Sequence, residues 1–220
     1  MKAVTFSYDD GVKQDKRLIQ LLNKYNLKCT FNLNSGLQTG ASQWINNGVP
    51  IRRLNLLGLK EVYQGHEIAV HSLTHPYLEK QDIETIRNEI GTDKHNLEKC
   101  FGCSVQGMAY PYGTYDNRVI EVLKENSIQF ARTVDATEGF DSQSNLLEFR
   151  PTCHHSCNKL MELADEFIHL KPNVPKIFYI WGHSYELDVD SNWDMFETFC
   201  KRISNREDIF YGTNSEVLLS

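Results

Sequence analysis

Two adjacent carboxylates lie near the start of the chain, in the stretch TFSYDDG at residues 5–11. Asp9 and Asp10 repel each other when both are ionised, so stability alone does not favour the pair. Further along, the stretch HSLTH at residues 71–75 places two imidazoles four residues apart. Two imidazoles and a carboxylate form a ligand set that suits a catalytic divalent metal such as zinc. These residue types therefore predict hydrolytic chemistry at a metal ion.

The spacing gives each of the two carboxylates a different task. Asp10, His71 and His75 are the expected ligands of one divalent ion, for which we favour Zn²⁺. Asp9 precedes the ligand by one residue, so it is placed to accept a proton from an attacking water. The bound cation would also screen the repulsion between the carboxylates. Gly11 lets the backbone turn away directly after the pair.

The elements that must position these residues alternate between strands and helices. Runs of β-branched and aromatic residues predict strands at residues 3–8, 29–34, 66–72, 107–110, 129–134, 175–183 and 209–214. Apolar residues at helical spacing predict helices at residues 15–26, 54–65, 81–102, 117–126, 156–170 and 191–204. This order predicts one α/β domain over residues 1–220, with a mostly parallel sheet that closes or nearly closes into a barrel.

In a βα barrel the chemistry lies at the C-terminal ends of the strands. Asp9 ends the first predicted strand and His71 ends the third. Tyr112 follows the fourth strand, and His183 ends the strand at residues 175–183. A lone H-x-x-x-H pattern is more often structural than metal-binding. Here four separate strands bring reactive side chains to one face, and this agreement supports a site.

The composition is that of an ordinary globular protein. The chain has 220 residues, 40% of them hydrophobic and 24% charged, with a net charge of −6 and a pI near 5.8. The lack of a basic stripe argues against a nucleic-acid partner, and no run approaches the roughly 20 apolar residues of a membrane helix. No leader segment is recognisable at the N-terminus, which predicts a cytoplasmic protein. The sequence leaves the oligomeric state open.

Four stretches together resemble the ordered motifs of the polysaccharide deacetylase family, carbohydrate esterase family four. They are TFSYDDG, HSLTH, AYPYG at residues 109–113 and IWGHSYEL at residues 180–187, and they span almost the whole chain. The resemblance implies a distorted (β/α)₇ barrel and metal-dependent removal of an acetyl group from an N-acetylated sugar, less often from an O-acetylated one. It implies that Asp9 is the general base and that His183 is the general acid that protonates the departing amine. It also implies that the backbone N–H of Tyr112 helps to stabilise the oxyanion.

The sequence departs from the family pattern in the third motif. Ala109 stands where the family commonly has an arginine that pairs with the catalytic base. Arg150 and Arg132 both fall at or near strand ends and are candidates for that role, and we favour Arg150. The family's fourth motif, with an aspartate and a tryptophan, is not readable, and the irregular stretch at residues 135–149 occupies its region.

Cysteines and further histidines form two clusters outside these motifs. The six cysteines are too sparse for a disulfide scaffold. Four of them form two closely spaced pairs, which are read either as a structural zinc site or, as we favour, as buried free thiols: Cys100, Cys103, Cys153 and Cys157. His154 and His155 are candidates for substrate contact. Trp181 is a candidate for stacking on a sugar or for a place in the barrel core.

The favoured function is a zinc-dependent deacetylase of an N-acetylglucosamine-type oligo- or polysaccharide. A second reading is a hydrolase of a small non-sugar amide or cyclic ureide, because relatives on this barrel do that work. A third is a catalytically inactive carbohydrate-binding protein. Its marker would be the loss of Asp9 or His183, and both are present. The lack of a leader favours a small or soluble substrate over a cell-wall polymer.

Overall fold

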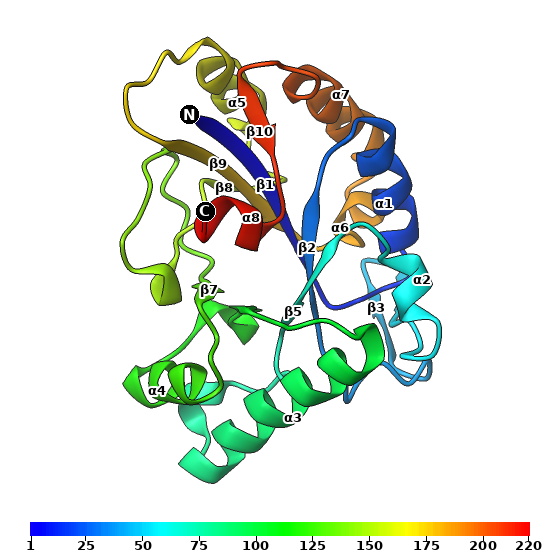
Figure 1. Cartoon of the computed structure of the whole chain (residues 1–220). Helices are drawn as coiled ribbons and strands as arrows, with labels where there is room; N and C mark the ends of the chain where they lie inside the picture. The colour runs from blue at the N-terminus through cyan, green and yellow to red at the C-terminus, as the bar shows by residue number, and fades with distance from the viewer.

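Strands and helices alternate along the chain in the computed structural model, which describes residues 1–220 (Figure 1). The strands of the main sheet are β1 (Lys2–Asp9), β2 (Cys29–Leu33), β5 (Glu67–Val70), β6 (Gly107–Ala109), β7 (Phe130–Arg132), β8 (Cys153–His154), β9 (Lys176–Gly182) and β10 (Ile209–Tyr211). A separate hairpin consists of β3 (Gln43–Asn46) and β4 (Val49–Arg52). The helices are α1 (Asp15–Lys24), α2 (Leu59–Val62), α3 (Ile83–Phe101), α4 (Asn117–Glu125), α5 (Leu160–His169), α6 (Glu186–Val189), α7 (Trp193–Ile203) and α8 (Asn214–Leu218).

The main sheet is parallel throughout and runs in the order β7-β6-β5-β2-β1-β9-β8. β10 pairs with the beginning of β1, at residues 2–4, while β2 pairs with its end, at residues 6–9. The end strands β7 and β8 do not pair with each other. The segment directly before β8 lies between them, because the N–H of Phe149 donates to the carbonyl of Ala131 in β7, and Cys153 then begins β8 and pairs with Ile180 of β9. The predicted distorted (β/α)₇ barrel is therefore confirmed as a curled sheet, although full closure is not reached.

β1 lies at the centre of the sheet, and all eight of its residues are buried. Side chains alternate between the two faces of a strand. Phe6 and Tyr8 take one face and pack against aromatic rings of α7. Thr5, Ser7 and Asp9 take the other face and hydrogen-bond to polar side chains there. The inside of the curl is therefore polar along a line that leads to Asp9.

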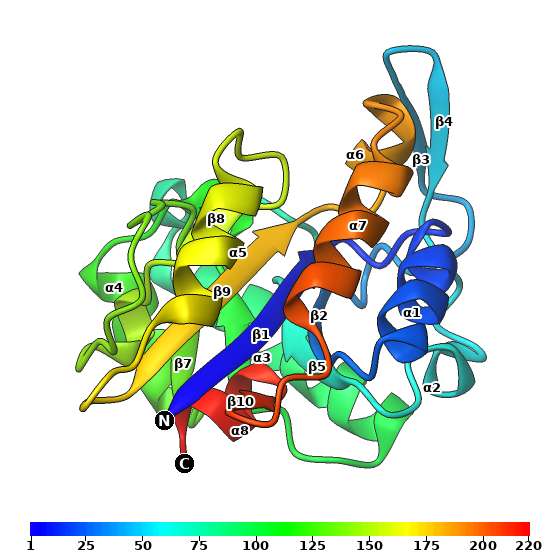
Figure 2. The ribbon, with the colours of Figure 1, turned by 90° about the horizontal axis from the view of Figure 1, so that it is seen from above.

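The longer helices cover the outside of the curled sheet, whereas α8 contacts its inner face through the hydrogen bond from Thr5 to Asn214. Figure 2 shows α5, α7 and α1 side by side over β9, β1 and β2, and α7 contacts both of its neighbours. The longest helix, α3, begins at an Asp82 side chain that accepts the N–H of Thr85 at 2.8 Å, and it ends at Gly102 with a left-handed φ of 69°. None of the helices has both the length and the apolar stretch needed to cross a lipid bilayer.

The hairpin β3–β4 is the main element that the sequence analysis did not predict. It turns at Asn47 and Gly48, whose φ angles are 47° and 82°. Two central residues with positive φ are typical of a type I′ hairpin turn, and an Asn-Gly pair is its strongest sequence signal. The helix predicted at residues 54–65 is shorter in the structure, because the N–H of Leu54 donates to the carbonyl of Gly11 instead of entering a helix.

Candidate active site

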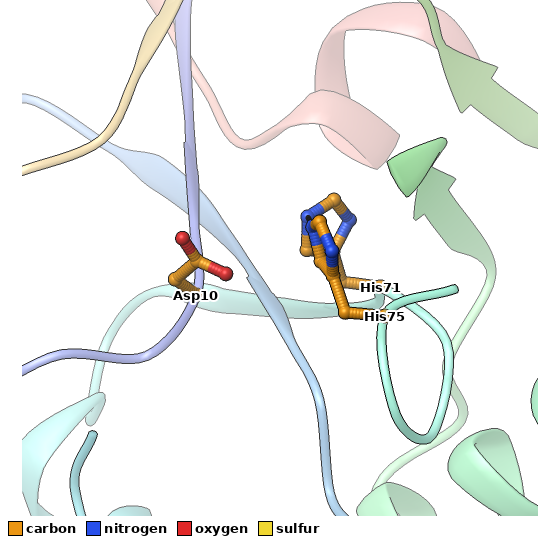
Figure 3. A group of neighbouring side chains, drawn as sticks. All are labelled: Asp10, His71 and His75. Carbon is orange, nitrogen blue, oxygen red and sulfur yellow. Dashed lines mark hydrogen bonds between the residues drawn. The ribbon is translucent and has the colours of Figure 1, made fainter. Parts of the chain in front are cut away.

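A sharp turn after β1 separates the two carboxylates. Asp10 and Gly11 have left-handed φ angles of 81° and 63°. A Cβ atom on Gly11 would lie 2.3 Å from Nε2 of Gln38 and 2.9 Å from Cδ2 of Leu33, so both the space and the backbone angle favour glycine. The turn leaves Asp9 inside the curl, where it accepts a hydrogen bond from Asn32. Asp10 lies opposite His71 and His75 of the loop after β5 (Figure 3).

The three predicted metal ligands come together in the structure. One ligand atom each of Asp10, His71 and His75 lies within 4.8 Å of the others (Figure 3). Nδ1 of His71 lies 2.7 Å from the carbonyl oxygen of Ala109, so Nδ1 carries the proton that this hydrogen bond needs. Nε2 of neutral His71 then has a free lone pair, and it lies 3.1 Å from Nε2 of His75. A carbonyl that orients one ring nitrogen while the other faces further ligands is usual for a metal-binding histidine. The side chains therefore fit a divalent cation.

Burial keeps both imidazoles in the neutral form that binds metals. Burial lowers the pKa of His71 to about 4. Burial also lowers the pKa of His75. Both rings are therefore neutral at pH 7, and a neutral imidazole is the form that coordinates a metal ion.

Helix α3 anchors the loop at residues 71–75. The carboxylate of Asp93 accepts the backbone N–H of His71 at 3.2 Å. The carboxylate of Glu89 accepts the backbone N–H of Thr74 at 2.8 Å and its hydroxyl at 2.6 Å. Residues four apart lie on the same face of a helix. The two carboxylates therefore hold the ligand loop from one side.

Replacing Glu89 with alanine should lower the free energy of unfolding by about 1–3 kcal/mol, because two donors of Thr74 lose their acceptor. Urea unfolding of the metal-free protein, followed by circular dichroism, measures this loss. Glu84→Ala is the matched control, since the Glu84 side chain lies on the same helix and is 80% exposed. Its effect should stay within about 0.5 kcal/mol. Equal losses in the two variants would contradict the anchoring role.

Arg132 supplies the cation beside Asp9. Its guanidinium forms a buried ion pair with Oδ2 of Asp9, and Asn32 donates to Oδ1 at 2.7 Å. Burial works to raise the pKa of Asp9, but Arg132 and the neighbouring imidazoles outweigh it and lower the pKa to about 2. Asp9 is therefore ionised at neutral pH, as a general base must be.

The prediction that Arg150 pairs with Asp9 is wrong. Arg150 is exposed, and its backbone N–H and carbonyl hydrogen-bond to Gln143. The reason lies in the strand register, because β6 and β7 place Ala109 and Arg132 side by side. Neighbours in register on parallel strands point to the same face. The arginine that the family carries in its third motif is thus supplied here from the next strand.

His183 follows β9 and approaches the same carboxylate. Its Nε2 lies 3.9 Å from Oδ2 of Asp9, which is also the distance from Nε2 of His71 to that oxygen. Oε1 of Glu186 lies 3.2 Å from Nδ1 of His183. Burial works to lower the pKa of His183, but Glu186 and other nearby carboxylates raise the pKa to about 9. The ring is therefore protonated at neutral pH, as a general acid must be.

Glu186 is a site residue that the sequence analysis missed. Its Oε2 accepts the backbone N–H of His183 at 3.0 Å and lies 3.0 Å from Nε2 of His154. The signal was present in the stretch GHSYEL, because a carboxylate three residues after a histidine is close enough to reach back to it. The spacing alone does not show whether such a contact forms.

The two histidines of the CHHSC stretch do not line the pocket over the metal site. His155 is buried, and its ring stacks on Tyr8 with 5.5 Å between the ring centroids. A Cβ atom on Gly182 would lie 2.0 Å from Nδ1 of His155, so β9 needs glycine there. Trp181 does line the pocket, and the guanidinium of Arg132 lies 4.4 Å from its ring centroid.

A pocket of about 540 Å³ lies over the carboxylates. The reactive groups and the pocket walls come from ten residues: Asp9, Asp10, His71, His75, Tyr110, Tyr112, Val134, Trp181, His183 and Tyr185. The walls are largely aromatic. Tyr112 has a left-handed φ of 58°, and its ring stacks on Tyr77 at 3.9 Å and packs against His75 at 4.6 Å. The oxyanion role of the Tyr112 N–H stays a prediction.

A second cavity, of about 490 Å³, lies at the N-terminal ends of β5 and β6. It borders Lys28, His66 and Cys103 but contains none of the predicted catalytic residues. All six cysteines are free. Two groups of side chains could hold a metal ion, Asp10 with His71 and His75, and His154 with His183 and Glu186, and neither group includes a cysteine. The structure therefore offers no cysteine zinc site. The predicted catalytic residues and metal ligands line the other pocket, at the C-terminal ends of the strands.

Comparison with known proteins gives the class of the protein. The family model described as polysaccharide deacetylase matches residues 1–131. The chain belongs to the polysaccharide deacetylase family, the carbohydrate esterase family four that its motifs resemble.

Three relatives illustrate the similarity. The peptidoglycan-N-acetylglucosamine deacetylase PgdA of Listeria monocytogenes is 26% identical over 132 residues, which are 59% of this chain and 26% of that protein. A family 4 acetyl xylan esterase from Clostridium thermocellum, solved with a cobalt ion, has a TM-score of 0.60 and 15% identity over 99% of this chain and 90% of its own. A Bacillus anthracis pseudoenzyme of the family, in a mutant with restored activity, has a TM-score of 0.61 and 18% identity over 98% and 67%. The chain spans less than half the length of the curated relatives that it matches.

Proposed function

We propose that the protein is a zinc-dependent hydrolase that removes the acetyl group from an N-acetylated sugar of the N-acetylglucosamine type. The position of Asp9 carries the proposal. This carboxylate is kept ionised by Arg132, lies beside the metal ligands, and has the protonated ring of His183 3.9 Å away. An ionised base and a protonated acid thus share one pocket with a cation site.

Amide hydrolysis needs an activated water, a partner for the tetrahedral oxyanion and a proton for the leaving nitrogen. A zinc ion held by the three ligands would polarise the carbonyl group and lower the pKa of a water. Asp9 would accept the proton of the attacking water. His183 would give its proton to the amine as the C–N bond breaks, and the N–H of Tyr112 would donate to the oxyanion.

Family membership supports a carbohydrate substrate. PgdA carries the name of an N-acetylglucosamine deacetylase, and a Streptomyces lividans carbohydrate esterase of the same fold was solved in complex with acetate. The aromatic walls of the pocket suit the apolar faces of a sugar ring. Trp181 and Tyr185, which lie two residues before and two residues after the proposed acid His183, are two of these aromatic wall residues.

Metal binding is tested by elemental analysis after reconstitution with zinc. Wild-type protein should hold about one zinc ion, and His71→Ala and His75→Ala should each hold far less, because a catalytic site has only three protein ligands. His95→Ala, an exposed histidine on α3, is the control and should keep the wild-type content. Equal zinc content in all four proteins would exclude the site.

Acetate release from N-acetylglucosamine oligomers by the zinc-loaded protein tests the reaction. A panel of small N-acetyl amides in parallel distinguishes a sugar deacetylase from a hydrolase of small amides. Pseudoenzymes occur in the family, so an inactive carbohydrate-binding protein is the concrete alternative. Oligosaccharide binding without acetate release from any substrate would favour that alternative and overturn the enzyme.

A further inference from the structure

The predicted metal ligand Asp10 is paired with an arginine that the family motifs do not include. Nη2 of Arg53 lies 2.8 Å from Oδ1 of Asp10, and both side chains are 8% exposed. Nη1 donates to Oδ1 of Asn34 at 2.6 Å and to the carbonyl of Asp10 at 3.2 Å. The guanidinium also lies 5.3 Å from the ring centroid of Trp44. The surroundings therefore fix the cation beside the ligand.

The hairpin β3–β4 brings Arg53 to this position. Arg53 directly follows β4, its N–H donates to the carbonyl of Ser42 at 3.0 Å, and it forms a β-bridge with Val12 in the turn after β1. Figure 2 shows the hairpin standing out from the end of the molecule near α6. An element outside the four motif stretches thus contributes a buried charge to the metal site.

We propose that Arg53 tunes the metal site, because its charge weakens the binding of the divalent cation and leaves that cation a stronger Lewis acid. Two positive charges that share one carboxylate repel each other, and solvent screens this repulsion little in a buried site. Part of the negative charge of Asp10 is committed to Arg53, so less of it compensates the metal ion. The inference rests on the proposed metal site but not on the identity of the substrate.

Arg53 also orients the carboxylate, and this effect has the opposite sign. Loss of a group that orients a metal ligand typically lowers metal affinity by about 10–100-fold. Two other features hold Asp10 without Arg53: the left-handed turn at residues 10–11, and Gln38, whose Nε2 donates to the carbonyl of Asp10 at 2.8 Å. A neutral residue with a hydrogen-bond donor keeps part of the orientation and loses all of the charge. We therefore expect the charge to decide the result in such a variant.

Arg53→Gln and Arg53→Lys separate the charge from the hydrogen bond. The Kd for Zn²⁺ is measured at pH 8 by competition with a chromophoric chelator. Arg53→Gln should bind zinc at least about tenfold more tightly than wild type, and Arg53→Lys should stay within about threefold of it. Arg52→Gln is the matched control, because Arg52 is exposed, hydrogen-bonds to Gln43 and should leave the Kd unchanged.

Zinc binding that is unchanged or weaker in a folded Arg53→Gln protein would overturn the proposal. A loss of affinity in both Arg53 variants would do the same and would assign Arg53 to orientation alone. Should glutamine prevent folding, Arg53→Met replaces it, since methionine is neutral and can pack on Trp44. Methionine has no hydrogen-bond donor, so tighter zinc binding in this variant would support the charge effect, and equal or weaker binding would overturn the proposal. Measuring the Kd needs no turnover. The role of Arg53 can therefore be disproved while the proposed reaction holds, and the proposed reaction can be disproved while the role of Arg53 holds.

Discussion

Replacing Asp9 with asparagine should lower kcat/KM for an N-acetylated sugar by about 10²–10⁴-fold, which is the usual contribution of a general base. Asparagine has nearly the same shape, and its single side-chain oxygen can still accept a hydrogen bond from Arg132, but its NH2 group no longer accepts the one from Asn32 and it cannot take a proton. The three metal ligands are unchanged, so the zinc content should stay at the wild-type level. Acetate release and zinc content are measured on the same sample.

Asp10→Asn is the matched control, because it changes the neighbouring carboxylate, which is a proposed metal ligand. This variant should hold less zinc, and added zinc should restore part of its rate. In Asp9→Asn, added zinc should restore nothing, because the metal is already bound. Wild-type turnover by a zinc-loaded Asp9→Asn protein would show that another group acts as the base.

The strand ends and the candidate metal ligands could be predicted from the sequence because both depend on short-range patterns. A run of β-branched and aromatic residues marks a strand, and the barrel geometry then places the next polar residues at one edge of the sheet. Asp9, His71 and His183 are each next to such a run. Their convergence follows from the topology, and in the structure Nε2 of His71 and Nε2 of His183 each lie 3.9 Å from Oδ2 of Asp9.

The partners of these residues were harder to predict because they depend on strand register and side-chain reach. Arg132 pairs with Asp9 across 123 residues of sequence, and Arg53 pairs with Asp10 across 43. The choice between Arg132 and Arg150 was decided by the register that sets Arg132 beside Ala109. The hydrophobic pattern does not indicate that register here, because all three residues of β7 are buried and show no alternation between faces. A shift by one residue would send the Arg132 side chain to the opposite face.

Replacing His183 with alanine should lower kcat/KM for an N-acetylglucosamine oligomer by about 10²–10⁴-fold and should lower the rate on an aryl acetate far less. The amine of a sugar is a poor leaving group and needs a proton as the C–N bond breaks, whereas a phenolate leaves without one. Zinc bound by Asp10, His71 and His75 should be retained, because His183 is not one of these three proposed ligands. Equal losses on the two substrates would mean that His183 positions the substrate or the oxyanion.

The pH profile tests the same assignment without removing the imidazole. Since the pKa of His183 is raised to about 9, kcat/KM should fall as the pH rises through that value and the acid loses its proton. The pKa of Asp9 is lowered to about 2, so the base stays ionised throughout this range. Glu186→Gln removes the carboxylate that raises the pKa of His183, and the alkaline limb should therefore move to lower pH. An alkaline limb that stays in place while the rate falls would make Glu186 a structural support and would remove His183 as the group that titrates.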